Sequence, residues 1–111
     1  MTKQYLGEFE QMVLLAALQL KESAYAPDIN RELEKSAARR VSRGALYATL
    51  ERLERKDFLK WRIQEATSDR GGHRKRLFEV TAAGGEVLKT SRSALENLWS
   101  GLDDVFVESR R

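Results

Sequence analysis

One stretch of the chain, from Ser42 to Lys56, constrains the fold most, because its pattern predicts an amphipathic α-helix with two unlike faces. The hydroxyl of Ser42 can accept a hydrogen bond from a free amide of the first helical turn. Leu46, Leu50 and Leu53 recur at steps of four and three residues, which is the spacing of one apolar helical stripe. The other side of the helix carries Gly44, Ala48, Glu51 and Arg55, and its flanks carry Tyr47 and Arg52.

This amphipathic helix has two interpretations when it is taken alone. A surface helix that packs its leucines inward and leaves a charged face in water has the same pattern. Small residues at Gly44 and Ala48 would also let the helix axis approach another surface closely, and a DNA major groove about 12 Å wide is one such surface. The neighbouring segments favour the second interpretation.

A first helix is predicted from Leu6 to Leu20, because apolar residues recur there at helical spacing. The segment from Met12 to Leu18 is apolar on nearly every side, and a helix of that kind is buried on most sides. The pattern therefore favours a central core helix. A second interpretation stays open, in which part of this helix contacts a partner subunit or a ligand through Met12, Leu15 and Gln19.

A second helix is predicted around Pro27, which fits the first helical turn because its missing amide is not needed there. Ile29 and Leu33 supply its apolar stripe, and the helix is expected to end near Ser36. A short link follows, in which Val41 could form one short strand. Two helices joined by such a link are typical of a helix-turn-helix, whose second helix enters the DNA groove.

An alternating pattern follows the Ser42–Lys56 stretch and predicts a β-hairpin. Leu59, Trp61 and Ile63 alternate with polar residues, which is the period of a half-buried strand. After a loop that contains two glycines, residues 74–80 predict the returning strand. Its core-facing side chains are expected to be Phe78 and Val80.

The hairpin is rich in cations near its tip, and this cluster is the second functional signal. Positive side chains beside glycines suit a phosphate backbone, because main-chain amides can also approach it. The helix-turn-helix immediately before the hairpin favours this interpretation over a solvated charged turn. The residues concerned are Arg70, Gly71, Gly72, His73, Arg74, Lys75 and Arg76.

A last helix is predicted from Ala82 to Val107, with Thr81 as its N-terminal cap. Its apolar residues follow a heptad-like seam. A helix of about 25 residues would be about 38 Å long, more than a small domain can cover. A second copy of the chain is the simplest partner for the far end, although part of it could fold back onto the first helix. The seam consists of Leu88, Leu95, Leu98, Leu102 and Val105, and it is widened by Trp99 and Phe106.

The composition excludes several classes of function. The 111 residues are enough for one domain, and they contain no cysteine and only one histidine. Disulfides, thiolate metal sites and cysteine nucleophiles are thus excluded, and no metal or other cofactor is expected. Nothing resembles a nucleophile–base pair or a Walker loop, so no enzyme is predicted. No apolar run approaches the length of a membrane span, and a cytoplasmic protein is expected.

Three stretches together resemble the PadR family of bacterial transcriptional regulators. They are LGEFEQMVLLAAL (Leu6–Leu18), SRGALYATLERLERK (Ser42–Lys56) and DRGGHRKRLFEVTAAG (Asp69–Gly84). The resemblance implies a mainly α fold with a small β-hairpin: a winged helix-turn-helix DNA-binding domain over residues 1–81 and one C-terminal dimerisation helix over residues 82–111. It implies a homodimer that represses transcription from a pseudo-palindromic operator.

The resemblance also implies two sets of site residues. The DNA-facing tyrosine of the family corresponds to Tyr47. The cluster at residues 70–76 corresponds to the basic wing of the family, and the hairpin is called the wing below. Together with that cluster, the expected DNA-binding set includes Ser42, Arg43, Gly44, Tyr47, Ala48 and Glu51. Dimer interfaces in this family can hold planar aromatic effectors, and the expected effector or dimer residues are Leu15, Leu95, Leu98, Trp99, Leu102 and Phe106.

The sequence departs from the family pattern at two places, and two functional alternatives stay open. The usual Tyr-Gly pair is Tyr25-Ala26 here, and Asp57 stands where a glycine usually follows the recognition helix. One alternative is a winged-helix module that binds an acidic protein instead of DNA. The other concerns Trp99, whose side chain could be packed in the dimer interface instead of contacting an effector.

Overall fold

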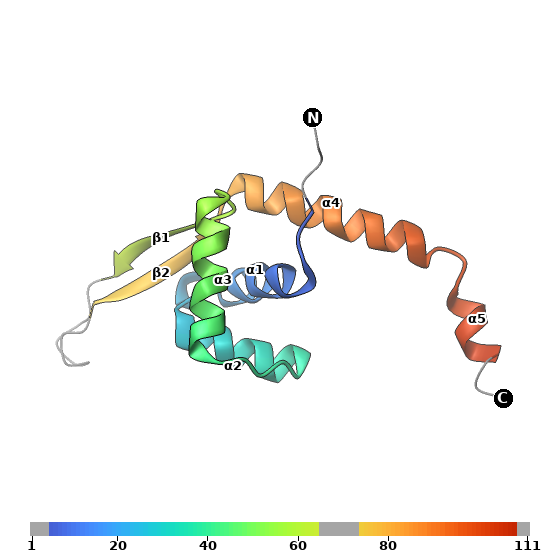
Figure 1. The fold of residues 1–111 in the computed structure, drawn as a ribbon, viewed down its shortest axis with the longest axis horizontal. Helices are drawn as coiled ribbons and strands as arrows, with labels where there is room; N and C mark the ends of the chain where they lie inside the picture. Colours follow the sequence, from blue (N-terminus) through green and yellow to red (C-terminus); the bar gives the residue numbers. More distant parts are fainter. Residues whose placement is uncertain (1–4, 65–73, 109–111) are drawn as a thin grey trace.

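The structure is a computed structural model that describes residues 5–64 and 74–108. It is mainly helical with one two-stranded antiparallel hairpin, as the sequence predicts. Figure 1 shows the elements in chain order: α1 (Glu8–Leu20), a 3-10 turn (Lys21–Ser23), α2 (Ala26–Ala37), α3 (Arg43–Arg55), β1 (Leu59–Gln64), β2 (Lys75–Val80), α4 (Ala82–Trp99) and α5 (Asp103–Glu108).

The core lies where α1, α2 and α3 meet the base of the hairpin. The predicted apolar stripe of α3 is fully buried, because Leu46, Leu50 and Leu53 are each at most 2% exposed. They pack in one cluster with side chains from the other elements. These include Val13, Leu14, Ile29, Leu33, Leu59, Leu77 and Phe78.

The termini of the helices follow from local chemistry. Ser42 Oγ accepts a hydrogen bond from the Ala45 amide at 3.1 Å and so caps α3, as predicted. Pro27 lies in the first turn of α2, also as predicted. The helix α2 ends at Ala38 in the left-handed conformation, with φ of 50°. Val41 is not in a strand, and its carbonyl instead accepts a hydrogen bond from the side-chain amide of Asn30.

The hairpin pairs Leu59 with Val80 at its base and Gln64 with Lys75 at its outer end. The amide of Phe78 donates to the carbonyl of Ala24 at 2.9 Å, which ties β2 to the helical body. Phe78 is buried as predicted, and Val80 is half-buried. Trp61 and Ile63 are more exposed than a half-buried strand implies, because the hairpin extends beyond the helices that cover its base (Figure 1).

The prediction that α1 is a core helix is confirmed by Val13, Leu14, Ala16 and Ala17, which are each at most 5% exposed, but one side of the helix is not buried. Leu15 is 49% exposed and Leu18 is 48% exposed, and Gln19 is also exposed. Only the first half of α4 packs on the body, through residues such as Val87 and Leu88. One face of α1 therefore stays uncovered within the described part of the chain, which agrees with the alternative that it contacts a partner or a ligand.

The prediction of one uninterrupted C-terminal helix is also wrong. The helix α4 ends at Trp99, and Gly101 adopts a positive φ of 79°, so the chain turns before α5 begins at Asp103. Glycine weakens a helix interior, and acidic residues favour a helix N-terminus, so this short segment contains both a stop and a start signal. No helix in the described residues is both long and apolar enough to cross a bilayer.

Candidate nucleic-acid interface

The outward face of α3, called the reading face below, carries residues that are predicted to contact DNA. Gly44, Ala48 and Glu51 are exposed on the side of the helix away from its leucines. A Cβ atom added to Gly44 would meet nothing within 4 Å, so this turn is open to an approaching surface. The guanidinium of Arg43 lies 5.7 Å from the ring centroid of Tyr47, and Tyr47 itself packs partly against the core. The face is thus shallow at its start, with a cation and a phenol beside it.

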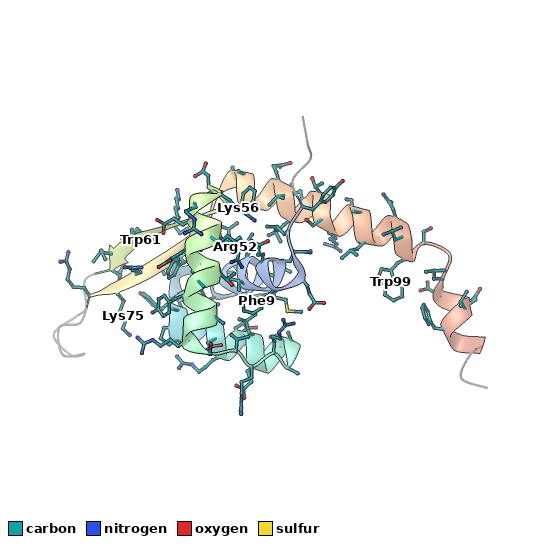
Figure 2. The ribbon with its side chains drawn as sticks, viewed as in Figure 1. Phe9, Arg52, Lys56, Trp61, Lys75 and Trp99 are labelled. Atoms are coloured by element: carbon teal, nitrogen blue, oxygen red, sulfur yellow. The ribbon has the colours of Figure 1, made fainter. Side chains whose placement is uncertain are left out.

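Two cations of the wing, Lys75 and Arg76, lie over aromatic rings. Lys75 Nζ lies 5.4 Å from the ring centroid of Tyr25, and the Arg76 guanidinium lies 4.7 Å from that of Trp61. The indole N–H of Trp61 donates to Glu54 on α3. Figure 2 places Trp61 and Lys75 together at the hairpin end of the molecule. Aromatic rings stabilise cations above their faces, so the two cations are oriented before any ligand arrives.

An open groove of about 480 Å³ lies between the reading face and the wing. Three cations and two phenols converge on it, and Glu51 is the only acid among its lining residues. Such a groove can hold a phosphodiester, because phosphate oxygens accept hydrogen bonds from cations and hydroxyls alike. Its lining is Tyr25, Ala26, Pro27, Tyr47, Glu51, Arg74, Lys75, Arg76 and Phe78.

The structure brings most of the predicted DNA-binding residues onto one side of the molecule. Ser42, Arg43, Gly44, Tyr47, Ala48 and Glu51 lie along α3, and Arg74, Lys75 and Arg76 lie at the start of β2 beside it. Arg70, Gly71, Gly72 and His73 lie outside the described residues. Tyr25 was missed by the sequence analysis. Its position just before α2 was the available signal, because the chain enters a helix-turn-helix there.

A buried carboxylate on α1 was also missed. The side chain of Glu10 is 10% exposed, and it accepts hydrogen bonds from Arg52 Nε at 3.1 Å and Lys56 Nζ at 3.0 Å. Burial alone would raise the pKa of Glu10. Hydrogen bonds from the Gly7 amide, Lys56 and Arg52 outweigh that effect and hold its pKa below the ordinary value. The spacing of Gly7 and Glu10, which matches half of a capping box, was the sequence signal.

The predicted effector and dimer residues lie at the other end of the molecule, where Figure 2 places Trp99. Leu98 is 74% exposed and Trp99 is 55% exposed, and the rings of Trp99 and Phe106 lie 5.6 Å apart. A groove of about 520 Å³ between α1 and α4 contains Leu15, Leu95 and Trp99. Leu98, Leu102 and Phe106 are exposed but do not line that groove.

The described residues contain no group of three or more acidic or histidine side chains that could hold a metal ion. Every buried side-chain nitrogen or oxygen in the described part of the chain has a hydrogen-bond partner. The features that stand out are therefore two surfaces: a basic one around α3 and the wing, and an apolar one along α4 and α5.

Comparison with known proteins identifies the family and the fold. The sequence model of the transcriptional regulator PadR-like family matches residues 14–90. A PadR-like transcription factor from Bacteroides fragilis is 30% identical, with a TM-score of 0.70 over 87% of this chain and 88% of that one. PadR family regulators from Bacillus cereus (18% identity, TM-score 0.71, 88% and 90% covered) and Eggerthella lenta (22%, 0.67, 89% and 86%) share the fold. No curated protein is significantly similar in sequence.

Proposed function

The chain belongs to the PadR-like family of transcriptional regulators, and from this premise we propose that it is a homodimeric, sequence-specific DNA-binding repressor. Membership of the family makes it a regulator of transcription and not an enzyme. The proposal adds three things: the surface that meets DNA, the dimer, and control by an aromatic small molecule. In this proposal residues 1–81 form the DNA-binding domain and residues 82–111 the dimerisation segment.

The observation that carries DNA binding is the pairing of two surfaces on one side of the molecule. The open face of α3 suits base edges, because Gly44 and Ala48 let the helix approach closely. The adjacent groove, with Arg74, Lys75 and Arg76, suits the phosphate backbone. In this proposal α3 enters the major groove and the wing cations fix its register, with Tyr47 contributing a phosphate contact.

Recovery of bound fragments from genomic DNA tests this proposal most directly. A two-fold symmetric protein should select a pseudo-palindrome whose half-sites lie about 10 bp apart, or a multiple of that distance. Competition with a shuffled duplex of the same length then measures sequence specificity. Binding to an acidic protein, together with no affinity for duplex DNA even at low salt, would instead select the protein-interaction module.

The apolar surface of α4 and α5 supports the homodimer. Leu95, Leu98 and Trp99 are each about half-exposed or more, and they are followed by Leu102, Val105 and Phe106 on the short second helix. Monomeric proteins rarely leave so continuous an apolar surface in water. A second copy of the same surface would cover it with two-fold symmetry and would bring two reading helices onto one duplex.

The groove between α1 and α4 supports the aromatic effector. Leu15, Leu18, Leu95 and Trp99 line it, and Arg92 and Glu96 add polar groups. An effector would release DNA only by favouring a dimer whose reading helices are spaced differently. Titration of Trp99 fluorescence with a panel of planar aromatic compounds tests this proposal. No response across the panel would favour the interpretation that Trp99 is a packed interface anchor.

A further inference from the structure

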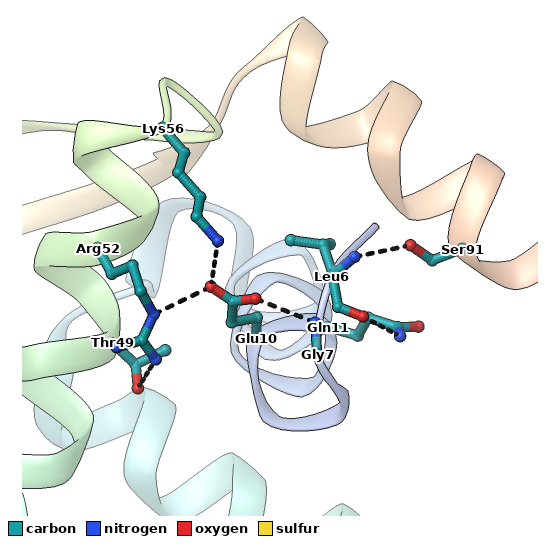
Figure 3. Close-up of polar contacts among 8 residues, drawn as sticks. All are labelled: Leu6, Gly7, Glu10, Gln11, Thr49, Arg52, Lys56 and Ser91. Carbon is teal, nitrogen blue, oxygen red and sulfur yellow. Dashed lines mark hydrogen bonds and ion pairs between the residues drawn. The ribbon is translucent and has the colours of Figure 1, made fainter. Parts of the chain in front are cut away.

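The recognition helix is held on one flank by a chain of hydrogen bonds that starts on α1. The Gly7 amide donates to Glu10 Oε1 at 3.0 Å, and Glu10 Oε2 accepts from Arg52 and Lys56 on α3. Figure 3 shows the carboxylate between the two helices, with its oxygens directed to opposite sides. A single buried side chain thus ties the start of α1 to the last turns of α3.

The chain of hydrogen bonds continues along α3 toward its N-terminus. Arg52 Nη2 donates to Thr49 Oγ1 at 3.3 Å, and the Thr49 hydroxyl donates to the Ala45 carbonyl at 3.1 Å. Ala45, Thr49, Arg52 and Lys56 share one side of the helix by their helical spacing. This side lies between the buried leucine stripe and the open face that carries Gly44 and Ala48, so it is adjacent to the proposed reading surface.

The same segment of α1 is also joined to the C-terminal helix. The amide of Leu6 donates to Ser91 Oγ on α4 at 3.2 Å, and this hydrogen bond is buried. The side chain of Gln11 donates to the Leu6 carbonyl at 3.1 Å (Figure 3). The short stretch from Leu6 to Gln11 therefore contacts α4 through Ser91 and contacts α3 through Glu10.

We propose that Glu10 is a positioning residue that sets the rotation of α3 about its own axis and joins that setting to the position of α4. Apolar contacts are not directional, so the leucine stripe alone does not fix the rotation of α3 about its axis. Charge-assisted hydrogen bonds are directional, and two of them from one buried carboxylate hold the helix flank in place. This inference rests on the proposed function, because the rotation of α3 matters only if its outer face reads DNA.

The sharpest test is the specificity ratio, the affinity for the recovered operator divided by that for a shuffled duplex of the same length. In Glu10→Gln the side chain keeps its size but loses its charge, and Arg52 and Lys56 become available to phosphates. We expect operator affinity to fall about tenfold while affinity for shuffled DNA stays equal or rises, since misaligned base contacts each cost roughly that factor. A lower fraction of folded protein alone would reduce both affinities equally.

Glu8→Gln is the matched control. Glu8 lies in the first turn of the same helix and changes the net charge by the same amount. Its ion-pair partner is Arg39, at 2.9 Å on the exposed surface, and within the described residues Glu8 forms no hydrogen bond or ion pair with α3. We expect its specificity ratio to match that of the wild type. Thr49→Val, which removes the next hydrogen bond in the chain without changing charge, should lower the ratio in the same direction and serves if Glu10→Gln does not fold.

Each outcome separates the inference from the function on which it rests. If wild-type protein does not distinguish the operator from shuffled DNA, the proposed function itself fails. If the wild type does so and Glu10→Gln and Thr49→Val keep its ratio, the positioning role of Glu10 is overturned. If Glu8→Gln lowers the ratio as much as Glu10→Gln does, net charge and not the hydrogen-bonded chain is the cause, and the role is likewise overturned.

Discussion

A single carboxylate, Glu10, shows how much one residue can organise in a small domain. Burial of an ionised group is unfavourable unless hydrogen bonds and opposite charges replace the lost water. Glu10 receives one amide hydrogen bond and two from cations. Its two cationic partners are more than a third exposed, so part of the attraction is screened by solvent. The balance still favours the charged carboxylate, because its pKa lies below the ordinary value.

That depressed pKa predicts how the stability of the protein depends on pH. The pKa of the carboxyl in the unfolded chain is about 4.3. In the folded protein the pKa of Glu10 is lower than its ordinary value. The stabilisation from Glu10 is therefore complete above the unfolded pKa and is lost as pH falls through the folded pKa. At pH 7 we expect Glu10→Gln to reduce the free energy of unfolding by about 1–2 kcal/mol. The difference between the two proteins should shrink below about pH 4.3.

Urea unfolding of both proteins at pH 7, 5 and 4 measures this difference. Other acids, such as Glu34 with its pKa lowered by Arg40, are present in both proteins and cancel in the comparison. A difference that grows as the pH falls would contradict the assigned direction.

Two adjacent glycines at the start of α4 predict opposite effects of the same substitution. A Cβ atom on Gly84 would lie 2.2 Å from the Phe58 carbonyl oxygen and 2.9 Å from Val80 Cγ1, so α4 could not approach the hairpin as it does. We expect Gly84→Ala to lower the free energy of unfolding by about 2 kcal/mol or more. A Cβ atom on Gly85 would meet nothing within 4 Å, and Gly85→Ala should stabilise by about 0.5–1 kcal/mol. Thermal unfolding of both variants checks the pair, and similar midpoints would refute it.

Residue-level prediction from the sequence succeeded where the signal was local and missed what was distant. The cap at Ser42 and the stripe of three leucines depend on residues within a few positions of one another. The partners of Glu10 lie 42 and 46 positions away, and no periodicity within α1 indicates them. The groove at Tyr25 likewise depends on a strand that returns much later in the chain.

At the scale of whole elements, the predicted helices and both hairpin strands are present, but Val41 forms no strand and the last helix is broken. Helix ends depend on single backbone conformations that periodicity does not encode. The break between α4 and α5 is the largest difference, and it coincides with Gly101. The heptad seam runs through this break in the sequence, which explains why a repeat of apolar residues suggested one continuous helix.

Glycine substitutions just after α2 and α3 are predicted to stabilise the protein, and by more after α2 than after α3. Ala38 after α2 and Asp57 after α3 both adopt the left-handed conformation, with φ of 50° and 65°. Glycine has no Cβ penalty there, and aspartate tolerates the conformation better than alanine. We expect Ala38→Gly to raise the free energy of unfolding by about 1 kcal/mol and Asp57→Gly by less. Chemical denaturation measures both, and a larger gain at Asp57 would contradict the order.

The wing predicts a measurable change in salt dependence. Under the proposed function, Arg74→Ala removes one phosphate contact, so affinity should fall about equally for all sequences, and the slope of log affinity against log salt should decrease by about one. Lys35→Ala is the control, because Lys35 is exposed in the last turn of α2 and lines neither the basic groove nor the groove between α1 and α4. Titrations at several salt concentrations measure both slopes. An unchanged slope for Arg74→Ala would argue against a wing–phosphate contact.

At the scale of the whole molecule, the described chain is elongated, with extents of 58 × 40 × 22 Å. The helical body and the hairpin occupy one end, and α4 and α5 extend away from them (Figure 1). This shape explains why the sequence of α1 predicted a core helix but did not show that one of its sides would stay exposed. Its apolar residues face both the core of one chain and the surface that α4 leaves uncovered. A pattern in one chain does not distinguish burial within a subunit from burial between two.

The proposed dimer predicts that a charge in the apolar seam separates the chains. Among the described residues Leu98 is the most exposed large apolar side chain. Leu98→Glu would place like charges near each other across a two-fold axis. We expect the mass measured by sedimentation at micromolar concentration to fall from about 25 kDa, twice the 12.7 kDa chain, to that of a single chain. The substitution should weaken the dimer by roughly 2–3 kcal/mol or more.

Ser93→Glu is the control. It adds the same charge on the opposite side of α4 by helical spacing and should leave the dimer intact. Operator affinity should fall together with the dimer, because one reading helix alone keeps only half of the contacts. If the wild-type protein sediments as a single chain under these conditions, the proposal that two α3 helices bind one duplex together is contradicted.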